Sequence, residues 1–148
     1  MLNLGQSAFL RNRKNKVRKT VLKIPTKQVY IRKASSKVLE ALRAYSLNED
    51  RMFDIRLCVE EAMRNAMVHG NHNDKHRTVR VAYWIRENKL NIEVEDEGSG
   101  FDYKALPDPT AGDNLMKGSG RGVYLIKNLM DEIKFNECGN KIKMVKYL

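Results

Sequence analysis

The hydrophobic residues of this 148-residue chain recur with two different periods, and this change of period constrains its fold most strongly. Over residues 50–69 the apolar positions return every three or four residues, as on one face of an α-helix. Over residues 79–94 they alternate with polar positions, as in a hairpin of two strands that bury one face. The chain is therefore predicted to combine amphipathic helices with antiparallel strands.

Other elements are predicted around these two segments. They are a first strand within residues 20–30 that is broken at Pro25, a helix capped by Ser35 or Ser36, a third helix after Gly122, and a closing hairpin of residues 133–135 and 142–148. Gly70 fits the stop of the helix over residues 50–69. Residues 97–121 are rich in Gly, Pro, Asp and Ser, which is typical of a long loop that acts as a lid or is disordered.

Positive charge is concentrated near the N-terminus. The net charge is +10, yet residues 1–39 hold eleven Lys or Arg and no acidic residue, so the remainder is close to neutral. We expect residues 1–19 to form a basic flexible arm and residues 20–148 a single folded domain. The neutral body disfavours nucleic-acid binding, although the arm leaves that function open.

Membrane insertion and a disulfide framework are not predicted. No apolar run is long enough to span a bilayer, and no secretory signal precedes the domain. The two cysteines, Cys58 and Cys138, are expected to stay reduced, so we predict a cytoplasmic protein.

The first of three polar clusters lies near the end of the helix over residues 50–69. Glu61 and Asn65 are four residues apart and so share a face of that helix. A carboxylate beside an amide oxygen can place a proton acceptor next to a magnesium ligand, because magnesium prefers hard oxygen donors. Taken alone, the same spacing is more often an exposed polar helix face.

The second and third clusters are rich in glycine. Residues 96–100, Asp-Glu-Gly-Ser-Gly, follow a strand, where a carboxylate could accept a hydrogen bond from the amine of adenine. Residues 118–122, Gly-Ser-Gly-Arg-Gly, open a helix, where free N–H groups and the helix dipole favour phosphate. Each could also be a simple glycine turn. The chain contains neither a P-loop nor the motif set of the eukaryotic-type protein kinases.

In order and spacing the three clusters resemble the N, G1 and G2 boxes of the gyrase/histidine-kinase ATPase superfamily, from about Thr20 to Leu148. The stretches VEEAMRNAMVHGN and GRGVYLIKNLMDEIKF are similar to those of its anti-sigma regulatory serine kinases. The resemblance implies the Bergerat fold: an α+β, two-layer α/β sandwich in which three helices cover one face of a mixed, mostly antiparallel sheet.

The resemblance also implies a role for each motif residue, with ATP and Mg²⁺ as ligands. Glu61 would be the general base and Asn65 the magnesium ligand. Asp96 would bind the adenine amine, and Gly98 and Gly100 would shape the pocket around the adenine. The lid and phosphate contacts would come from Gly118, Gly120 and Gly122, and Arg121 would approach the γ-phosphate.

The function implied is that of an anti-sigma factor with protein serine/threonine kinase activity. Such a protein would sequester a sigma factor and phosphorylate an anti-anti-sigma partner of the STAS type on serine. The alternative is a non-catalytic module that binds proteins according to its bound ATP or ADP. A homodimer is left open.

One further pattern competes with this interpretation. His69, His72 and His76 are spaced by three and four residues, as in some zinc sites. Gly70 is expected to end the helix within this cluster, and no thiolate lies nearby, so we disfavour a zinc site.

Overall fold

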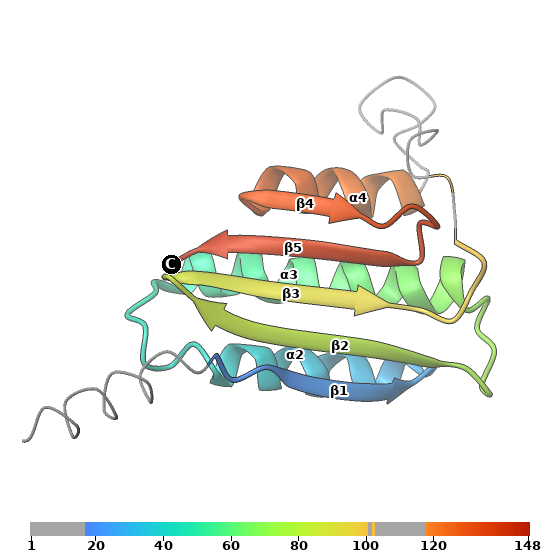
Figure 1. The fold of residues 1–148 in the computed structure, drawn as a ribbon, viewed down its shortest axis with the longest axis horizontal. Coiled ribbons are helices and arrows are strands. Elements are labelled where there is room, and N and C mark those ends of the chain that lie inside the picture. The colour runs from blue at the N-terminus through green and yellow to red at the C-terminus, as the bar shows by residue number, and fades with distance from the viewer. Residues whose placement is uncertain (1–16, 101, 103–117) are drawn as a thin grey trace, which may run out of the picture.

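The computed structural model describes residues 17–100, 102 and 118–148, and it shows two layers (Figure 1). One layer is a five-stranded sheet, and the other consists of three helices that all cover the same face of that sheet. The sheet contains β1 (Thr20–Pro25), β2 (Thr78–Arg86), β3 (Lys89–Glu95), β4 (Glu132–Phe135) and β5 (Lys141–Tyr147). The helices are α2 (Ile31–Glu40), α3 (Glu49–Asn65) and α4 (Gly118–Leu129). The two-layer sandwich expected from the sequence is confirmed.

The strands lie in the order β1-β2-β3-β5-β4, and each pair among these described strands is antiparallel. β2 and β3 are joined by Glu87 and Asn88, whose φ angles of 51° and 57° are those of a two-residue hairpin turn. Alternate side chains of each strand face the helices. The hairpins predicted over residues 79–94 and 133–148 are therefore both present.

The hydrophobic core lies between the two layers. Its fully buried side chains come from all three helices and from the inner face of the sheet. They include Val38, Leu42, Ile55, Val59, Met63, Val79, Val81, Leu90, Ile92, Ile126 and Met144. Cys58 is also buried there, and burial raises the pKa of its thiol to about 12, which makes it chemically inert. In the part of the chain that the structure describes, no helix is both long and apolar enough to cross a membrane.

The predicted start of the first helix was wrong. α2 begins at Ile31, after a short 3-10 turn of Gln28–Tyr30, so Ser35 and Ser36 lie inside the helix rather than at its N-cap. The hydroxyl of Ser36 donates to the carbonyl oxygen of Arg32 at 2.8 Å, and the hydroxyl of Ser35 lies 3.0 Å from the same oxygen while it also donates to Glu60. Serine can satisfy its hydroxyl within a helix in this way, so its presence did not mark the helix end.

The helix predicted after Gly122 also begins earlier than expected, at Gly118. The glycines of the third cluster therefore form the first turns of α4 instead of preceding it. The helix predicted over residues 50–69 consists of α3 followed by one π-helical stretch, η2 (Ala66–Gly70). Such π-helical turns recur at functional sites.

The N-cap of α3 provides a test of what stabilises the helical layer. The side chain of Asn48 accepts a hydrogen bond of 2.9 Å from the backbone N–H of Arg51 and so caps the helix. We expect Asn48→Ala to lower the free energy of unfolding by about 1 kcal/mol, measured by chemical denaturation. Asn48→Asp retains an acceptor and should preserve stability. Equal stability of the alanine variant would contradict the capping role.

Candidate nucleotide-binding site

Asp96, the predicted adenine ligand, directly follows β3 at the edge of a cleft. Its backbone N–H donates to the carbonyl oxygen of Asn140 at 2.9 Å, which ties it to the turn between β4 and β5. Its Oδ1 accepts a 2.8 Å hydrogen bond from the N–H of Gly98. The residue is only 6% exposed, so its carboxylate is fixed in place.

Two glycine backbones pack directly on this carboxylate. A Cβ atom added at Gly70 would lie 2.1 Å from Asp96 Cγ, and one at Gly98 would lie 2.1 Å from the carbonyl oxygen of Gly70. Real Cβ atoms do not approach other atoms so closely, so neither position accepts a side chain without a shift of its neighbours. Gly70, which the sequence suggested only as a helix stop, is therefore also a wall of the site.

Gly100 packs against the turn between β4 and β5 instead of against Asp96. Its φ angle of +87° favours glycine, and an added Cβ would lie 1.6 Å from the carbonyl oxygen of Cys138. The segment after β3 consequently packs tightly on the β4–β5 turn. The sequence predicted that Gly98 and Gly100 shape the pocket. The structure places Gly98 against Asp96 and Gly100 against the β4–β5 turn, and their contact with a nucleotide stays a prediction.

Sequence reasoning missed Asn71, which binds the backbone next to Asp96. Asn71 is fully buried, and its side-chain oxygen accepts a 2.8 Å hydrogen bond from the N–H of Glu97. Its Nδ2 donates to Thr26 Oγ1 and to the carbonyl oxygen of Thr78, each at 3.0 Å. Asn71 follows Gly70 in the motif stretch, but its partners Thr26 and Glu97 are distant in sequence, so only the structure reveals its role.

The cleft beside Asp96 lies between α3, α4 and the β4–β5 turn. Its walls are mainly apolar, with polar groups at the Asp96, Asn65, Asn140 and Lys141 positions. The apolar lining consists of Ala62, Ala66, Val94, Val123, Ile126, Phe135 and Ile142. Apolar walls with a few fixed polar groups are the lining that a flat aromatic ring with an amine requires, and the cleft would have to widen to admit one.

Glu61 and Asn65 meet α4 at Gly122. An added Cβ at Gly122 would lie 3.0 Å from both Glu61 Oε2 and Asn65 Nδ2, so both side chains reach the first turns of α4. The other oxygen of Glu61, Oε1, accepts a 2.5 Å hydrogen bond from the guanidinium of Arg64. This arrangement brings the predicted base and the predicted magnesium ligand together.

Glu60 faces a different neighbour. Its Oε1 accepts a 2.8 Å hydrogen bond from Ser35 of α2 and lies 3.7 Å from the guanidinium of Arg56. The two adjacent glutamates therefore point to different helices, and Glu61 is the one on the α4 side.

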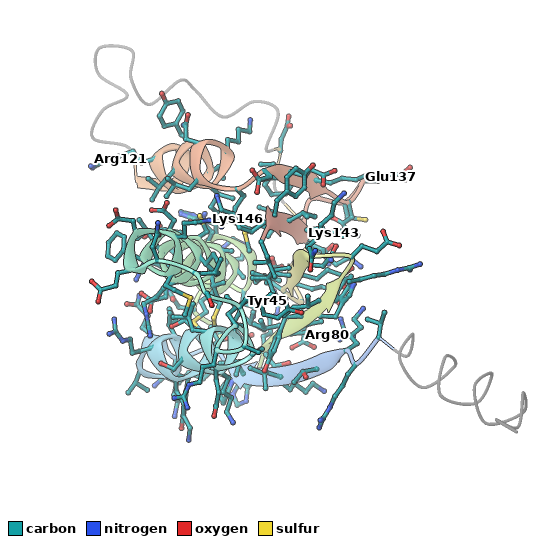
Figure 2. All side chains as sticks on the ribbon, turned by 90° about the vertical axis from the view of Figure 1, so that its left-hand side faces the viewer. Tyr45, Arg80, Arg121, Glu137, Lys143 and Lys146 are labelled. Atoms are coloured by element: carbon teal, nitrogen blue, oxygen red, sulfur yellow. The ribbon has the colours of Figure 1, made fainter. Side chains whose placement is uncertain are left out.

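The rest of the third cluster lies at the start of α4. Gly118, Gly120 and Gly122 are all helical, and Arg121 is exposed (Figure 2). The role of Arg121 at a γ-phosphate stays a prediction. The lid that the sequence predicted falls mostly on residues 103–117, outside the described residues.

The three histidines are exposed, on or just after η2. Within the described ranges, no three His, Cys, Asp or Glu side chains are arranged to hold a metal ion. The donor that would suit Mg²⁺ is instead the side-chain oxygen of Asn65, a hard ligand of the kind magnesium prefers. Asn65 fits an ion that is shared with phosphate oxygens.

Fold and site together define a nucleotide-binding domain in which one carboxylate faces an apolar cleft and a second polar pair lies at a helix N-terminus. Comparison with known families identifies it: the family described as "Histidine kinase-like ATPase domain" matches residues 24–146. The chain belongs to this family. The superfamily expected from the three motifs is thereby confirmed.

Among curated proteins the chain is similar to several named "Serine-protein kinase RsbW". It is 35% identical to that of Bacillus subtilis over 108 residues, which cover 67% of this chain and 66% of the relative. It is 26% identical to that of Listeria monocytogenes over 137 residues, which cover 88% and 87%. It is 31% identical to that of Staphylococcus aureus over 107 residues, which cover 67% of each.

A solved structure, that of the SiaB-SiaC complex from Pseudomonas aeruginosa, contains a chain with a similar fold. The TM-score is 0.61 at 14% identity, and the match covers 97% of this chain and 99% of the other. At this identity the likeness supports the fold alone.

The buried carboxylate generates a test of the adenine assignment. We expect Asp96→Asn to weaken ATP and ADP alike, by about 10-fold to 100-fold, because both share the adenine amine and a bond to a charged acceptor is lost. Isothermal titration with each nucleotide measures this effect. An unchanged affinity for both would refute the assignment.

The same assignment predicts a dependence on pH. Burial raises the pKa of the Asp96 carboxyl above its ordinary value, although the Gly98 N–H bond opposes the rise. The ionised carboxylate is the stronger acceptor of a hydrogen bond from the adenine amine. The affinity for ATP and ADP should therefore fall as the pH drops through this raised pKa. The fall should begin at a higher pH than an exposed aspartate would give, and Asp96→Asn should remove it.

Proposed function

We propose that this chain is an ATP-dependent protein serine kinase and anti-sigma factor. It phosphorylates an anti-anti-sigma protein of the STAS type on serine and, when that partner is absent, sequesters a sigma factor. The names of the curated relatives, all serine-protein kinases, support the kinase activity. A function of this kind belongs in the cytoplasm.

The observation that carries the proposal is the position of Glu61. One of its oxygens faces Gly122, one turn into α4 from the helix N-terminus that favours phosphate groups, and the other is held by Arg64. A carboxylate held beside a phosphate site can accept a proton from a hydroxyl that approaches from solvent. Glu61 is partly exposed, with 23% of its side chain accessible, so a protein substrate can reach it.

The chemistry assigned to Glu61 is general-base catalysis. The serine oxygen of the partner forms a bond to the γ-phosphorus of ATP while the bond from that phosphorus to the bridging oxygen breaks, and ADP leaves. The hydroxyl proton passes to Glu61 as the new bond forms. Arg64 orients the carboxylate from its other side and is a positioning residue.

Asn65 lies one helical turn after Glu61 and supplies an amide oxygen on the same side. Mg²⁺, when bound with ATP, would neutralise phosphate charge during the transfer. Asn65 would hold that ion and Asp96 would hold the adenine, so the nucleotide would extend from the cleft to the start of α4. Arg121, Gly118 and Gly120 would lie at its phosphate end.

Two adjacent glutamates provide a matched pair of variants. We expect Glu61→Gln to reduce phosphorylation of the partner by about 10²-fold or more while ATP affinity stays near normal, because the shape is kept and the base is lost. Glu60→Gln is the control, since Glu60 contacts α2 and should leave the rate near that of the unchanged protein. The assay detects phosphoserine by mass spectrometry on the candidate anti-anti-sigma protein.

The opposite result is equally informative. If Glu60→Gln abolishes transfer while Glu61→Gln does not, the wrong carboxylate has been assigned. If the unchanged protein forms no phosphoserine but still binds its partner according to ATP or ADP, the chain is a non-catalytic binding module.

The close contact at Gly122 yields a second test. A methyl group there would press on Glu61 and Asn65 at 3.0 Å. We expect Gly122→Ala to lower the phosphorylation rate by at least about 10-fold, while the higher helix propensity of alanine, up to about 1 kcal/mol, offsets the strain in stability. Thermal unfolding and phosphorylation measured on one sample separate these effects. An unaltered phosphorylation rate would show that α3 and α4 can move apart at Gly122 without disturbing Glu61 and Asn65.

A further inference from the structure

The outer face of the sheet, opposite the helices, is strongly basic. Side chains that alternate with the core positions of the five strands, together with Lys19 just before β1, point to this face. Figure 2 shows the layers from the side and labels Arg80 and Lys143 on the sheet layer, away from the helices. The cationic members are Lys19, Lys23, Arg80, Arg86, Lys89, Lys134, Lys141 and Lys143, against only Glu93, Glu95 and Glu132.

The few acidic residues do not neutralise this face. Glu93 is shared by Lys19 at 3.3 Å and Arg80 at 3.9 Å, and Glu95 lies 3.8 Å from Lys141. Four lysines of the face have no carboxylate within salt-bridge distance among the described residues. They are Lys23, Lys89, Lys134 and Lys143.

An aromatic side chain lies at the centre of this charge. Trp84, the single tryptophan of the chain, is partly exposed on the outer face of β2. The ammonium groups of Lys19 and Lys143 lie 4.4 and 5.4 Å from its ring centroid. A second aromatic ring, Tyr147, is 44% exposed two strands away, and the ammonium of Lys89 lies 4.9 Å from its centroid.

We propose that the outer face of the sheet, centred on Trp84, binds single-stranded nucleic acid. Lysines around an exposed aromatic ring offer both elements that such a strand requires, namely cations for its phosphates and a flat apolar surface for a base. A stacked base would displace Lys19 from the ring. Base stacking contributes about 1–3 kcal/mol per base, whereas an exposed cation–π contact contributes about 0.5–1 kcal/mol, so the exchange is favourable.

Two other occupants fit the face less well. A second copy of this chain would have to pack the same surface against itself, which would bring eight cationic side chains toward eight more. An acidic protein would neutralise the lysines, but its carboxylates would not stack on the two exposed aromatic rings. A flexible polyanion with planar bases uses both features.

The proposed nucleic-acid face lies apart from the ATP cleft. The cleft is lined by residues of α3, α4 and the β4–β5 turn on the inner side of the sheet, whereas Trp84 alternates with the core positions of β2 and so lies on the outer face. The two sites can therefore be occupied together, and this proposal does not depend on the kinase activity.

The test uses the full chain and an oligo-dT strand of about 16 nucleotides, which lacks adenine and so avoids the ATP cleft. Because Trp84 is the only tryptophan, stacking of a base should quench the intrinsic fluorescence of the protein. Labelled oligo-dT followed by anisotropy gives the affinity of variants. We expect Trp84→Leu to weaken binding by about 10-fold, and saturating ATP to leave it unchanged.

The salt dependence separates a phosphate contact from a general charge effect. We expect Lys143→Ala to reduce the slope of log affinity against log salt by about 0.7, as for one lost phosphate contact on a single strand. Lys33→Ala is the matched control, because it removes the same charge from an exposed position on α2 and should leave the slope unchanged. Unfolding curves verify that each variant is folded.

Three outcomes would overturn the proposal. Binding that survives Trp84→Leu and Lys143→Ala but disappears when residues 2–16 are removed belongs to the basic arm. A concentration-dependent dimer that Lys143→Glu disrupts, without oligo-dT binding, makes the face a contact between two copies. Absence of fluorescence quenching with preference for polyglutamate over oligo-dT assigns the face to an acidic protein.

Discussion

Burial of the inner face of the sheet under α3 is the interaction on which the rest of the structure depends. This helix lies between α2 and α4 and contributes Ile55, Val59 and Met63 to the core. Because those residues fix its rotation, the next positions around the helix are fixed as well. Glu60 is thereby directed to α2 and Glu61 to α4, so hydrophobic packing determines which of two neighbouring carboxylates reaches the proposed phosphate site.

The polar half of the site depends on a second constraint, the burial of Asp96. A buried carboxylate is costly unless it is hydrogen-bonded, and here the Gly98 N–H supplies a bond while Asn71 and Asn140 hold the adjacent backbone. Burial raises the pKa of the Asp96 carboxyl, and the hydrogen bond from the Gly98 N–H opposes this rise. A carboxylate fixed in this way at an apolar cleft is well placed to accept a hydrogen bond from a ligand.

The sequence predicted most of the architecture where the hydrophobic period was regular, as in α3, β2 and β3. It failed at the starts of α2 and α4. In α2 the serine hydroxyls bond back into their own helix, and in α4 the glycine cluster, of which Gly122 packs closely on α3, lies within the helix. Glu61, Asn65 and Asp96 could be selected because local spacing carries their signal. The supporting roles of Asn71 and Asn140 could not, because they act only through contacts between distant segments.

The positive charge of the outer face could not be predicted from the sequence, for a related reason. A sum over residues 40–148 is close to neutral, but alternation along each strand sends successive residues to opposite faces. Lysines and arginines that appear dispersed in the sequence therefore meet on one surface around Trp84. Only the strand order and register, which sequence patterns do not give, reveal this concentration.

The contact between Gly70 and Gly98 has a consequence for how this fold can be altered. The two glycine backbones touch each other and enclose the same carboxylate, so a side chain added to one cannot be accommodated by trimming the other. Compensating mutations are thus unavailable at this pair. A chimera that brings a larger residue to either position would therefore have to move the facing backbone, at the end of η2 or in the segment after β3.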